Sequence, residues 1–486
     1  MTGQSVMREQ GDHSVPLVCD LDGTLIETDI TFELCLMHLK AHPITGWWFL
    51  LSGFLTDKAA TKDKLCAEYG AAISVEHLPY SDVLEHEKLA GYEDRALVSG
   101  SADAVVRNVA TRLGVFSHVQ GSDETRNLTG ERKAAYLKEA YPQGFDYVGD
   151  GKVDIAVWRA SRNAFAYNVS DATVAAAQAE GVELERLKKR PSEYAALFKA
   201  MRPHQWTKNA LLFVPPMLNL GMFAPFWLPY MLLGLIAFCM VTSATYLLND
   251  LLDIEADRAH ATKRARPFAA GTLSIPTGCT AIAALGIIGL ALAFALNVTF
   301  GLSVILYAIV SLVYSFSLKK VAVLDTIILS FLFCWRVVAG GFLFSVPNSV
   351  WFMVAIGFFF LSLALGKRAI ELNRAKSRAV APQGRGYRLE DLEVVKTAGL
   401  SASFVMVVII LIYALLSQST VISRDISAVL LATLFLFWQI RFWLLVGRDE
   451  VHDDPIIFAL KDRTSTVVLF GVLLVVLFEQ LMPGAV

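Results

Sequence analysis

Long apolar runs constrain this chain more than any other feature of its 486 residues. Beyond residue 208, nine such runs follow one another, and most are of the length that crosses a bilayer as a helix. They cover residues 209–224, 228–248, 277–296, 301–317, 323–344, 349–366, 397–416, 427–446 and 465–482. We therefore predict an all-α membrane domain of nine transmembrane helices over residues 209–486. The first helix is expected to be kinked or broken at Pro215 and Pro216.

Basic residues between the runs predict the topology. They gather in the linkers after the second, fourth, sixth and eighth runs, and Arg424 is the exception among the other linkers. The positive-inside rule then places these linkers and the amino-terminal segment in the cytosol, with Val486 on the opposite side. We expect a multi-pass protein of the inner (cytoplasmic) membrane, in contact with membrane lipids. The net charge of −2 gives no indication of nucleic acid, and no nucleic-acid partner is expected.

The first 200 residues hold most of the remaining charge and predict a separate domain. Residues 1–14 are polar without a signal-peptide pattern, so a cytosolic domain is expected to follow over residues 15–190. Residues 191–208 form an interfacial linker. It is preceded by the basic run Lys188, Lys189 and Arg190, which suits an anionic membrane face.

Short apolar runs in residues 15–190 end in polar side chains. PLVCDLDGTL leads to Asp20 and Asp22, RALVSGS leads to Ser99 and Ser101, a predicted helix start at Gly130 brings Lys133, and FDYVGDGKVD leads to Asp150 and Asp154. This order predicts a doubly wound α/β sheet whose site lies along one edge. Two carboxylates two residues apart can divide phosphoryl transfer between a nucleophile and a proton shuttle. DxDG alone also occurs in calcium loops and turns.

Taken together, these motifs resemble the haloacid-dehalogenase (HAD) phosphatase superfamily. The resemblance implies that Asp20 is the nucleophile and Asp22 the acid/base, and that Ser99, or alternatively Ser101, holds the phosphoryl group with Lys133. It also implies a Mg²⁺ site, and we assign Asp20, Asp22, Asp150 and Asp154 to it. Residues 28–94 are expected to form a helical cap. Within the cap, Trp47 and Trp48 are interpreted either as cap core or as part of a surface facing the membrane.

A second acidic motif leaves the membrane run 228–248. Asn249, Asp250, Asp253 and Asp257 fall at i, i+1, i+4 and i+8, which shares most of one helix face. Lys263, Arg264 and Arg266 follow. Carboxylates suit a divalent metal and the cations suit a phosphate, so the pattern predicts a magnesium-diphosphate site. The alternative is a solvated loop of mixed charge.

Further polar residues occur near the same predicted membrane face. An arginine at membrane depth is costly, so Arg336 is expected to face the interior of the helix bundle. The HDDP run at 452–455 is left open between a functional and a structural role. The other predicted substrate-binding residues here are Lys208, Tyr314, Lys319, Lys320, Asp325 and Lys367.

Residues from about 200 to 484 resemble the UbiA superfamily of intramembrane prenyltransferases. NDxxDxxxD at Asn249–Asp257 matches its first metal motif, whereas the second motif keeps Asp325 but has Leu329 in place of its partner acid. RPxQWxKN, RPxAxG and YSxxLKxxxxLD resemble the branch that makes polyprenylphosphoryl 5-phosphoribose. That resemblance implies phosphoribosyl diphosphate as donor, polyprenyl phosphate as acceptor and Mg²⁺ at Asp250, Asp253 and Asp257, with Asn249 beside them and with Lys263 and Arg266 helping to hold the diphosphate.

The joined domains predict a bifunctional enzyme in which the phosphatase removes the 5-phosphate of the transferase product. One alternative is an aromatic prenyltransferase that uses polyprenyl diphosphate and carries an unrelated phosphatase. Another is a transporter with a regulatory cytosolic domain, and a third is an inactive phosphatase-like domain that recruits partners. Oligomeric state is left open.

Overall fold

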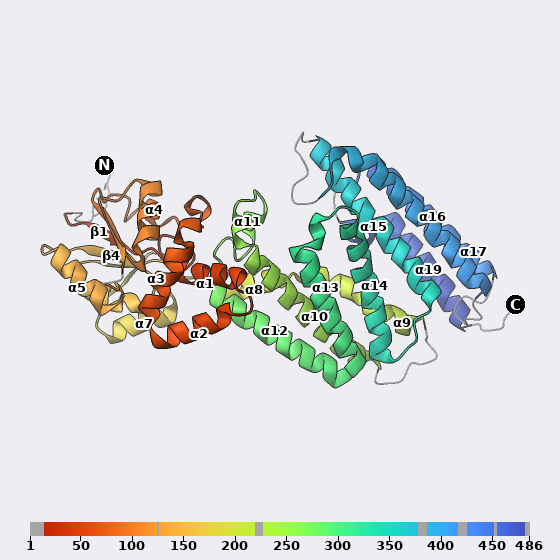
Figure 1. Cartoon of the computed structure of the whole chain (residues 1–486), viewed down its shortest axis with the longest axis horizontal. Helices are drawn as coiled ribbons and strands as arrows, with labels where there is room; N and C mark the ends of the chain where they lie inside the picture. The colour runs from red at the N-terminus through yellow and green to blue at the C-terminus, as the bar shows by residue number, and fades with distance from the viewer. Residues whose placement is uncertain are drawn as a thin grey trace, which may run out of the picture. The chain divides into compact units, whose positions relative to one another are not determined.

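The computed structural model describes residues 14–123, 126–218, 227–377, 386–416, 425–451 and 454–481. The chain forms two compact units. Unit 1 contains Met1–Met201 and Leu247–Ala281, and unit 2 contains Arg202–Tyr246 and Ile282–Val486. Figure 1 gives the order of the elements along the chain.

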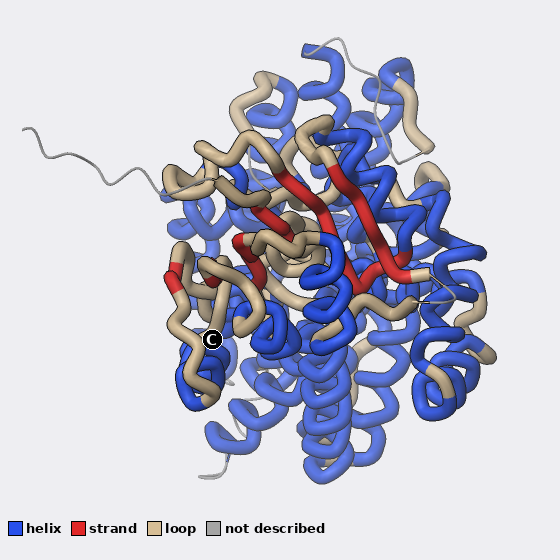
Figure 2. The backbone as a smooth tube through the Cα atoms, turned by 90° about the vertical axis from the view of Figure 1, so that its left-hand side faces the viewer, coloured by secondary structure: helices blue, strands red, loops and turns tan. Residues whose placement is uncertain are grey.

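Unit 1 is built on a parallel sheet, as the strand-end motifs predict. Its strands are drawn red in Figure 2. They lie in the order β3-β2-β1-β4-β5-β6, and every pairing is parallel. The strands are β1 (Leu17–Cys19), β2 (Arg95–Ala102), β3 (His118–Ser122), β4 (Asp146–Gly149), β5 (Ala164–Ala166) and β6 (Glu185–Arg186). Leu17 and Cys19 belong to one buried apolar cluster and Val18 to another, so the central strand is covered on both faces.

Helices connect the strands of this sheet. They are α4 (Asp103–Leu113), α5 (Glu131–Ala140), α6 (Ile155–Trp158) and α7 (Asp171–Ala179), and α8 (Glu193–Ala200) follows the last strand. In α4, Val105, Val106, Val109 and Ala110 are buried, which is the i, i+1, i+4, i+5 spacing of a helix that packs one face against a sheet.

The segment between β1 and β2 is helical. It contains α1 (Ile30–Ala41), α2 (Gly46–Thr56) and α3 (Lys58–Tyr69), followed by three short 3₁₀ turns. Asp29 begins α1 by accepting hydrogen bonds from the Thr31 and Phe32 amides. In α2 the side chains of Trp47 and Trp48 are 62% and 74% exposed, so their interpretation as cap core is wrong. Their contact with a membrane stays a prediction.

Unit 1 also includes a segment that the sequence places in the membrane domain. Leu247–Ala281 contains the end of α10 (Trp227–Leu252), α11 (Ile254–Arg258), the 3₁₀ turn η7 (Lys263–Ala265) and the first turns of α12 (Ile275–Leu296). The predicted linker at 191–208 spans the first boundary between the units, at Met201. The loop between α11 and α12 nevertheless packs with the amino-terminal sheet domain.

Unit 2 is helical throughout the part that the structure describes. Besides α10 and α12, its long helices are α13 (Val298–Phe316), α14 (Leu324–Phe344), α15 (Val350–Ser377), α16 (Leu392–Leu416), α17 (Asp425–Gly447) and α19 (Arg463–Leu481), with the short α18 (Pro455–Lys461) before α19. Helices α14 to α17 pack side by side in chain order (Figure 1). Many large apolar side chains, such as Ile287, Leu302 and Phe437, are exposed, as expected for helices that meet lipid.

The expectation of nine spanning helices is met only in part. Among the described residues, seven helices are long and apolar enough to cross a membrane, and the apolar part of α19, Arg463–Phe478, is shorter. The described part of the predicted first span, residues 209–218, belongs to a 3₁₀ segment, η5 (Pro203–Phe213), and one helical turn, α9 (Val214–Met217), so this span is broken near Pro215 and Pro216 as expected. Pro215 and Pro216 lack the amide hydrogens that a longer helix would need, and residues 219–226 lie outside the described part.

Candidate functional site

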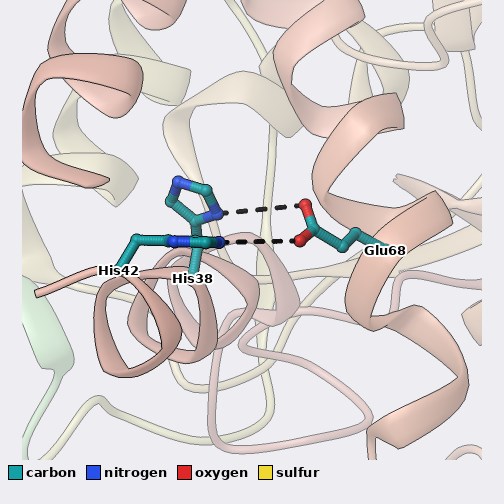
Figure 3. Close-up of side chains that lie close together, drawn as sticks. All are labelled: His38, His42 and Glu68. Atoms are coloured by element: carbon teal, nitrogen blue, oxygen red, sulfur yellow. Dashed lines mark ion pairs between the residues drawn. The ribbon is translucent and has the colours of Figure 1, made fainter. Parts of the chain in front are cut away.

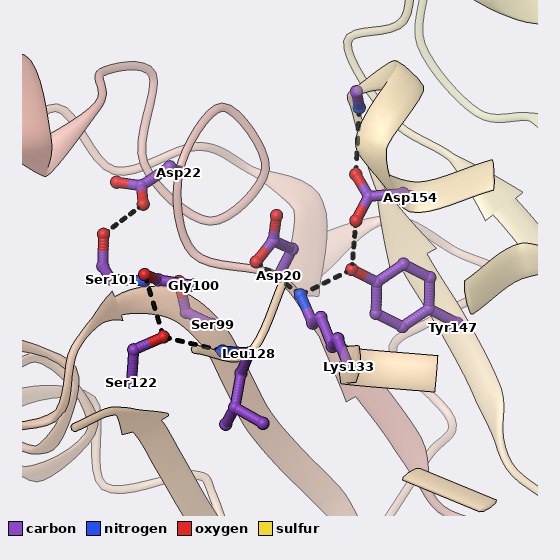
Figure 4. Close-up of polar contacts among 11 residues, drawn as sticks. Asp20, Asp22, Ser99, Gly100, Ser101, Ser122, Leu128, Lys133, Tyr147 and Asp154 are labelled. Carbon is purple, nitrogen blue, oxygen red and sulfur yellow. Dashed lines mark hydrogen bonds and ion pairs between the residues drawn. The ribbon is translucent and has the colours of Figure 1, made fainter. Parts of the chain in front are cut away.

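The carboxyl end of β1 places Asp20 in a buried polar network (Figure 4). Asp20 Oδ1 accepts a hydrogen bond from Lys133 Nζ at 2.8 Å, and Lys133 Nζ also donates to the Tyr147 hydroxyl at 2.7 Å. The Tyr147 hydroxyl donates to Asp154 Oδ1 at 2.6 Å. Because parallel strands end at one edge of the sheet, residues far apart in the sequence meet here as predicted.

Three of the predicted metal ligands form a group that fits Mg²⁺. Asp20, Asp150 and Asp154 each offer a carboxylate oxygen, and these oxygens lie within 4.8 Å of one another. Hard divalent cations take such oxygen donors. Burial and then the neighbouring carboxylates of Asp154 and Asp20 raise the pKa of Asp150 well above its usual range, so negative charge is crowded at a place where a cation would relieve it.

Asp22 is held apart from that group. Its Oδ1 accepts a hydrogen bond from the Ile30 amide at 2.9 Å, and its Oδ2 accepts one from the Ser101 hydroxyl. Burial, with a further contribution from the Asp29 carboxylate, raises the pKa of Asp22 to about 8. The predicted four-residue metal set is therefore a three-residue group, with Asp22 bound to the start of α1 and the end of β2.

The two serines of β2 take different positions. Ser99 is 1% exposed and its Oγ accepts a hydrogen bond from the Ser101 amide at 3.1 Å, whereas Ser101 contacts Asp22 (Figure 4). The choice between them as a phosphoryl-binding residue stays a prediction.

A cleft of about 670 Å³ opens beside Asp22 and Asp150 in unit 1. One side is formed by the sheet domain, including Glu27, Asn168 and Lys188. The other side is formed by the loop between α11 and α12, at Phe268 and Ala270–Pro276. Pockets of this volume hold small organic ligands, so the cleft has room for more than a phosphate group.

The acidic motif continues from α10 into α11. Asp253 separates the two helices, yet its amide bonds to the Asn249 carbonyl at 3.0 Å and the Asp257 amide bonds to the Asp253 carbonyl at 2.8 Å, so helical bonding passes through the motif. Asp250 and Asp257 are 3% and 1% exposed. Arg266 Nη1 lies 3.1 Å from Asp250 Oδ1 and 2.7 Å from Asp257 Oδ2.

Arg266 neutralises part of the negative charge of the motif. Arg266 bridges two buried carboxylates that would otherwise repel each other, and the carboxylate donors are of the kind that Mg²⁺ binds. Lys263 lies exposed in η7. Three carboxylates within eight residues thus provide suitable ligands for a metal, and Arg266 compensates one of their three negative charges.

Arg336 lies inside the helix bundle of unit 2, as predicted. It is 4% exposed, its Nε donates to Asn209 Oδ1 at 3.0 Å, and its Nη2 donates to the Tyr307 hydroxyl at 2.5 Å. The guanidinium also stacks over the rings of Tyr307 and Phe333, 4.8 and 5.1 Å from their centroids. A buried arginine is kept charged at low cost only with such partners.

Two predicted lysines share one carboxylate. Lys208 Nζ lies 3.4 Å and Lys367 Nζ 2.9 Å from Asp454 Oδ2. The Lys208 side chain is 10% exposed, and its Nζ lies 5.6 Å from the centre of the Phe333 ring. Arg336 contacts the same ring. In unit 2, Lys208 therefore shares Asp454 with Lys367 and the Phe333 ring with Arg336. His452 and Asp453 of the HDDP run lie outside the described residues.

Asp325 is a buried ion-pair partner. It is 0% exposed, its Oδ2 lies 2.6 Å from Arg368 Nε, and its Oδ1 accepts from the Tyr387 hydroxyl at 2.7 Å. The pair joins α14 to α15. Of the other predicted residues in this region, Tyr314 and Lys319 are half-buried and Lys320 is exposed.

A second group of metal-capable side chains lies between α1 and α3 (Figure 3). His38 Nδ1 is 4.0 Å from Glu68 Oε2, and His42 Nε2 is 3.9 Å from Glu68 Oε1. His38 also packs its ring 4.6 Å from that of Phe49 in α2. Since His42 and Glu68 are about half exposed, we interpret the group as ion pairs and ring packing that join the three helices.

Comparison with known proteins identifies the membrane half of the chain. Residues 212–455 match the UbiA prenyltransferase family. The chain is 36% identical over 464 residues to the uncharacterized protein y4nM of Sinorhizobium fredii, covering 93% of this chain and 89% of that protein. The chain belongs to the UbiA prenyltransferase family. It is accordingly an integral membrane protein with the helical transferase fold of that family.

Two named relatives match parts of this UbiA family member. The nodulation protein NoeC of Azorhizobium caulinodans is 34% identical over 297 residues, which is 58% of this chain and 92% of NoeC. The decaprenyl-phosphate phosphoribosyltransferase of Mycobacterium tuberculosis is 36% identical over 191 residues, which is 38% of this chain and 63% of that enzyme.

Several polar residues of this UbiA family member were not predicted as site residues. Tyr147 lies within the apolar strand β4, and the sequence of that strand does not indicate that its hydroxyl contacts Lys133 and Asp154. Arg258 and Glu33 are 225 positions apart and meet only in the folded chain. The ion pair of Arg368 with Asp325 likewise forms only when α15 packs on α14. The ion pair of Lys367 with Asp454 forms only when the segment before α18 packs on α15.

Proposed function

We propose that the membrane domain transfers a 5-phosphoribosyl group from phosphoribosyl diphosphate to a polyprenyl phosphate. The observation that carries the proposal is the 36% identity over 191 residues to a decaprenyl-phosphate phosphoribosyltransferase. Leu329, in place of an acid in the second motif, supports it, because an additional anionic group on the donor or acceptor is better received with one carboxylate fewer.

The donor is assigned to the acidic motif. Asp250, Asp253 and Asp257 would hold Mg²⁺, which when bound neutralises a diphosphate. Arg266 Nη1 lies 2.7 Å from Asp257, and when the diphosphate binds, its guanidinium would donate hydrogen bonds to phosphate oxygens in place of the carboxylates. In the reaction the bond between ribose carbon 1 and the diphosphate oxygen breaks, and positive charge develops on the ribose. Stabilising the leaving diphosphate is therefore the main catalytic requirement.

The acceptor requires placement and no general base. A polyprenyl phosphate is already an anion, so one of its oxygens forms the new bond to carbon 1 while diphosphate leaves with the bonding electrons. Lys208, Lys367 and Arg336 supply cations in unit 2 for the lipid phosphate or the 5-phosphate. Asp454, which contacts both lysines, acts as their positioning residue.

The amino-terminal domain is proposed to be a HAD-type phosphatase that removes the 5-phosphate of the transferase product. Asp20 would attack phosphorus, the phosphorus–oxygen ester bond would break, and Asp22 would give its proton to the leaving ribose oxygen, which departs as a hydroxyl. Water then attacks the aspartyl phosphate, Asp22 accepts a proton, and phosphate leaves. Lys133, 2.8 Å from Asp20, would neutralise phosphoryl oxygens, and Mg²⁺ at Asp20, Asp150 and Asp154 would supply further positive charge.

The positive-inside pattern supports a cytosolic position for both activities on the inner membrane. Together the two steps would convert phosphoribosyl diphosphate and polyprenyl phosphate into polyprenylphosphoryl ribose, diphosphate and phosphate, with one water consumed.

The transferase assignment is tested by supplying ribose-labelled phosphoribosyl diphosphate and polyprenyl phosphate to the purified protein with Mg²⁺. Labelled lipid is expected, and Asp257→Asn should abolish it. A parallel reaction with polyprenyl diphosphate and an aromatic acid tests the alternative donor. Product only in the second reaction would overturn the assignment.

The phosphatase assignment is tested with p-nitrophenyl phosphate. The wild-type protein should release nitrophenol in a reaction that requires Mg²⁺, and Asp20→Asn should not. Equal hydrolysis by both proteins would overturn the role of Asp20.

A further inference from the structure

The loop between α11 and α12 forms one side of the cleft beside Asp22 and Asp150. Phe268 and Ala270–Pro276 line this side, and Asp22, Gly23 and Asp150 line the side next to the proposed phosphatase centre. The loop belongs in sequence to the transferase half of the chain, within the family match at residues 212–455. A segment of the transferase sequence therefore completes a cleft of the sheet domain.

Direct contacts fix the loop against the sheet domain. Arg258 Nη1 and Nη2 lie 2.9 and 2.7 Å from the two oxygens of Glu33, and Arg258 Nε donates to the Ala269 carbonyl at 3.1 Å. At the far end of the loop, Ser274 Oγ donates to Glu193 Oε2 at 3.0 Å. Arg258 and Glu33 are 8% and 6% exposed, so the first contact is enclosed.

Gly271 permits the closest approach. Its φ is +72°, and a Cβ there would lie 2.2 Å from the Glu27 carbonyl oxygen. This distance is too short for any side chain, so the position requires glycine. Phe268, Ala269 and Leu273 are each buried to 3% exposure or less. The loop is thus packed into unit 1 and forms a fixed wall.

The lining of the cleft suits the body of a phosphorylated sugar. The carboxylates of Glu27 and Asp82, which are 22% and 69% exposed, line the cleft as acceptors, and the buried Asn168 beside them donates from its Nδ2 to Glu27 Oε2 at 2.9 Å. Acceptors of this kind match sugar hydroxyls. Phe32, Tyr80 and Leu273 add apolar surface, and the volume of about 670 Å³ exceeds what a phosphate alone would fill.

We propose that residues 268–276 form the specificity wall of the phosphatase site and that its substrate is a phosphate monoester of a lipid-linked sugar. The proposal rests on the proposed function of the sheet domain. The phosphate would lie at Asp20, the sugar would lie along Asn168 and the wall, and the lipid-linked end would extend beyond the cleft. A small aryl phosphate reaches Asp20 without needing the wall.

Thr272 offers a way to alter the wall without disturbing its core. It lines the cleft, is exposed, and its Oγ1 donates a long hydrogen bond to the Pro267 carbonyl at 3.3 Å. Thr272→Trp would fill part of the cleft. Thr262→Trp is the matched control, because Thr262 is exposed in the same loop but does not line the cleft.

The test compares two substrates, p-nitrophenyl phosphate and synthetic polyprenylphosphoryl 5-phosphoribose, with the full-length protein in detergent. Thr272→Trp is expected to lower kcat/KM for the lipid-linked substrate about tenfold or more, mainly through KM, and to leave kcat/KM for the aryl phosphate within about twofold. Thr262→Trp should change neither.

Each other outcome is informative. Equal losses with both substrates, or no loss with either, would overturn the specificity wall. If the wild-type protein hydrolyses the aryl phosphate but not the lipid-linked substrate, the substrate class is wrong while the phosphatase assignment stands. If the wild-type protein hydrolyses neither and equals Asp20→Asn, the proposed function itself fails.

Discussion

Glu33 of α1 and Arg258 of α11 form a bidentate ion pair that is buried within unit 1. Glu33 also accepts a hydrogen bond from the Thr28 hydroxyl at 2.6 Å, so both of its oxygens are satisfied. Asp257, next to Arg258, bonds to Arg266. One helical turn therefore carries both a residue of the proposed transferase site and the main anchor of the loop on the sheet domain.

We predict that Arg258→Met destabilises unit 1 strongly. The change leaves the Glu33 carboxylate buried without its cation, which costs about 3–5 kcal/mol when a buried pair is broken from one side. The double variant Glu33→Gln with Arg258→Met should recover part of this loss. Thermal unfolding in detergent, followed for each variant, measures the difference.

The exposed pair Lys40–Glu255 provides the control. Its atoms are 3.8 Å apart and its side chains are 28% and 47% exposed, so Glu255→Gln should cost at most about 1 kcal/mol. If Arg258→Met shifted the unfolding temperature no more than Glu255→Gln does, the pair would not anchor the loop.

We predict that Gly271→Ala is more damaging than Gly181→Ala. Both glycines have positive φ, +72° and +74°, so both changes carry a backbone cost of about 1 kcal/mol. Only at Gly271 would the new Cβ meet a carbonyl oxygen, whereas nothing lies within 4 Å at Gly181. Limited proteolysis should therefore cleave the α11–α12 loop faster in Gly271→Ala alone. Equal cleavage in both variants would contradict the close packing.

The parallel sheet and its polar edge could be predicted from local sequence. Short apolar runs that end in Asp20, Ser99 and Asp150 carry their own signal, because parallel strands bring their carboxyl ends to one edge. The buried position of Arg336 was also predictable, since a charge in an apolar run needs polar partners.

Contacts between distant segments could not be predicted in this way. The docking of residues 247–281 on the sheet domain depends on the ion pair of Arg258 with Glu33. Nothing in the sequence around Glu33 distinguishes it from any other polar residue of a helix. The pairing of Asp325 with Arg368 likewise requires the packing of α14 on α15. The break in the predicted first span was expected from Pro215 and Pro216, but apolar composition did not indicate the 3₁₀ conformation of Pro203–Phe213 before them.

We predict that Tyr147→Phe weakens the response of the phosphatase to Mg²⁺. The lost hydroxyl joins Lys133 to Asp154, a proposed metal ligand, and partners of ligands typically contribute about 10–100-fold to metal affinity or activity. The Mg²⁺ concentration for half-maximal aryl phosphate hydrolysis should rise accordingly. Tyr92→Phe, which removes a buried hydroxyl bonded to Asp146, should leave that concentration unchanged. The same rise in both variants would indicate a general loss of structure.

We predict that Lys208→Met impairs the transferase. Lys208 is 10% exposed and is linked through Asp454 to Lys367, so its loss removes one of the cations assigned to phosphate. Label transfer to lipid should fall about tenfold or more. Lys396→Met, which breaks an ion pair of Lys396 with Glu393 in unit 2, should change it less than about twofold. Comparable losses would remove Lys208 from the proposed site.

Mass spectrometry of the lipid product, made from phosphoribosyl diphosphate, polyprenyl phosphate and Mg²⁺ by the wild-type protein and by Asp20→Asn, tests the two-step account most directly. The account predicts polyprenylphosphoryl ribose from the wild type and polyprenylphosphoryl 5-phosphoribose, heavier by one phosphoryl group, from Asp20→Asn. The same product from both proteins, or no ribose-containing lipid from either, would contradict it.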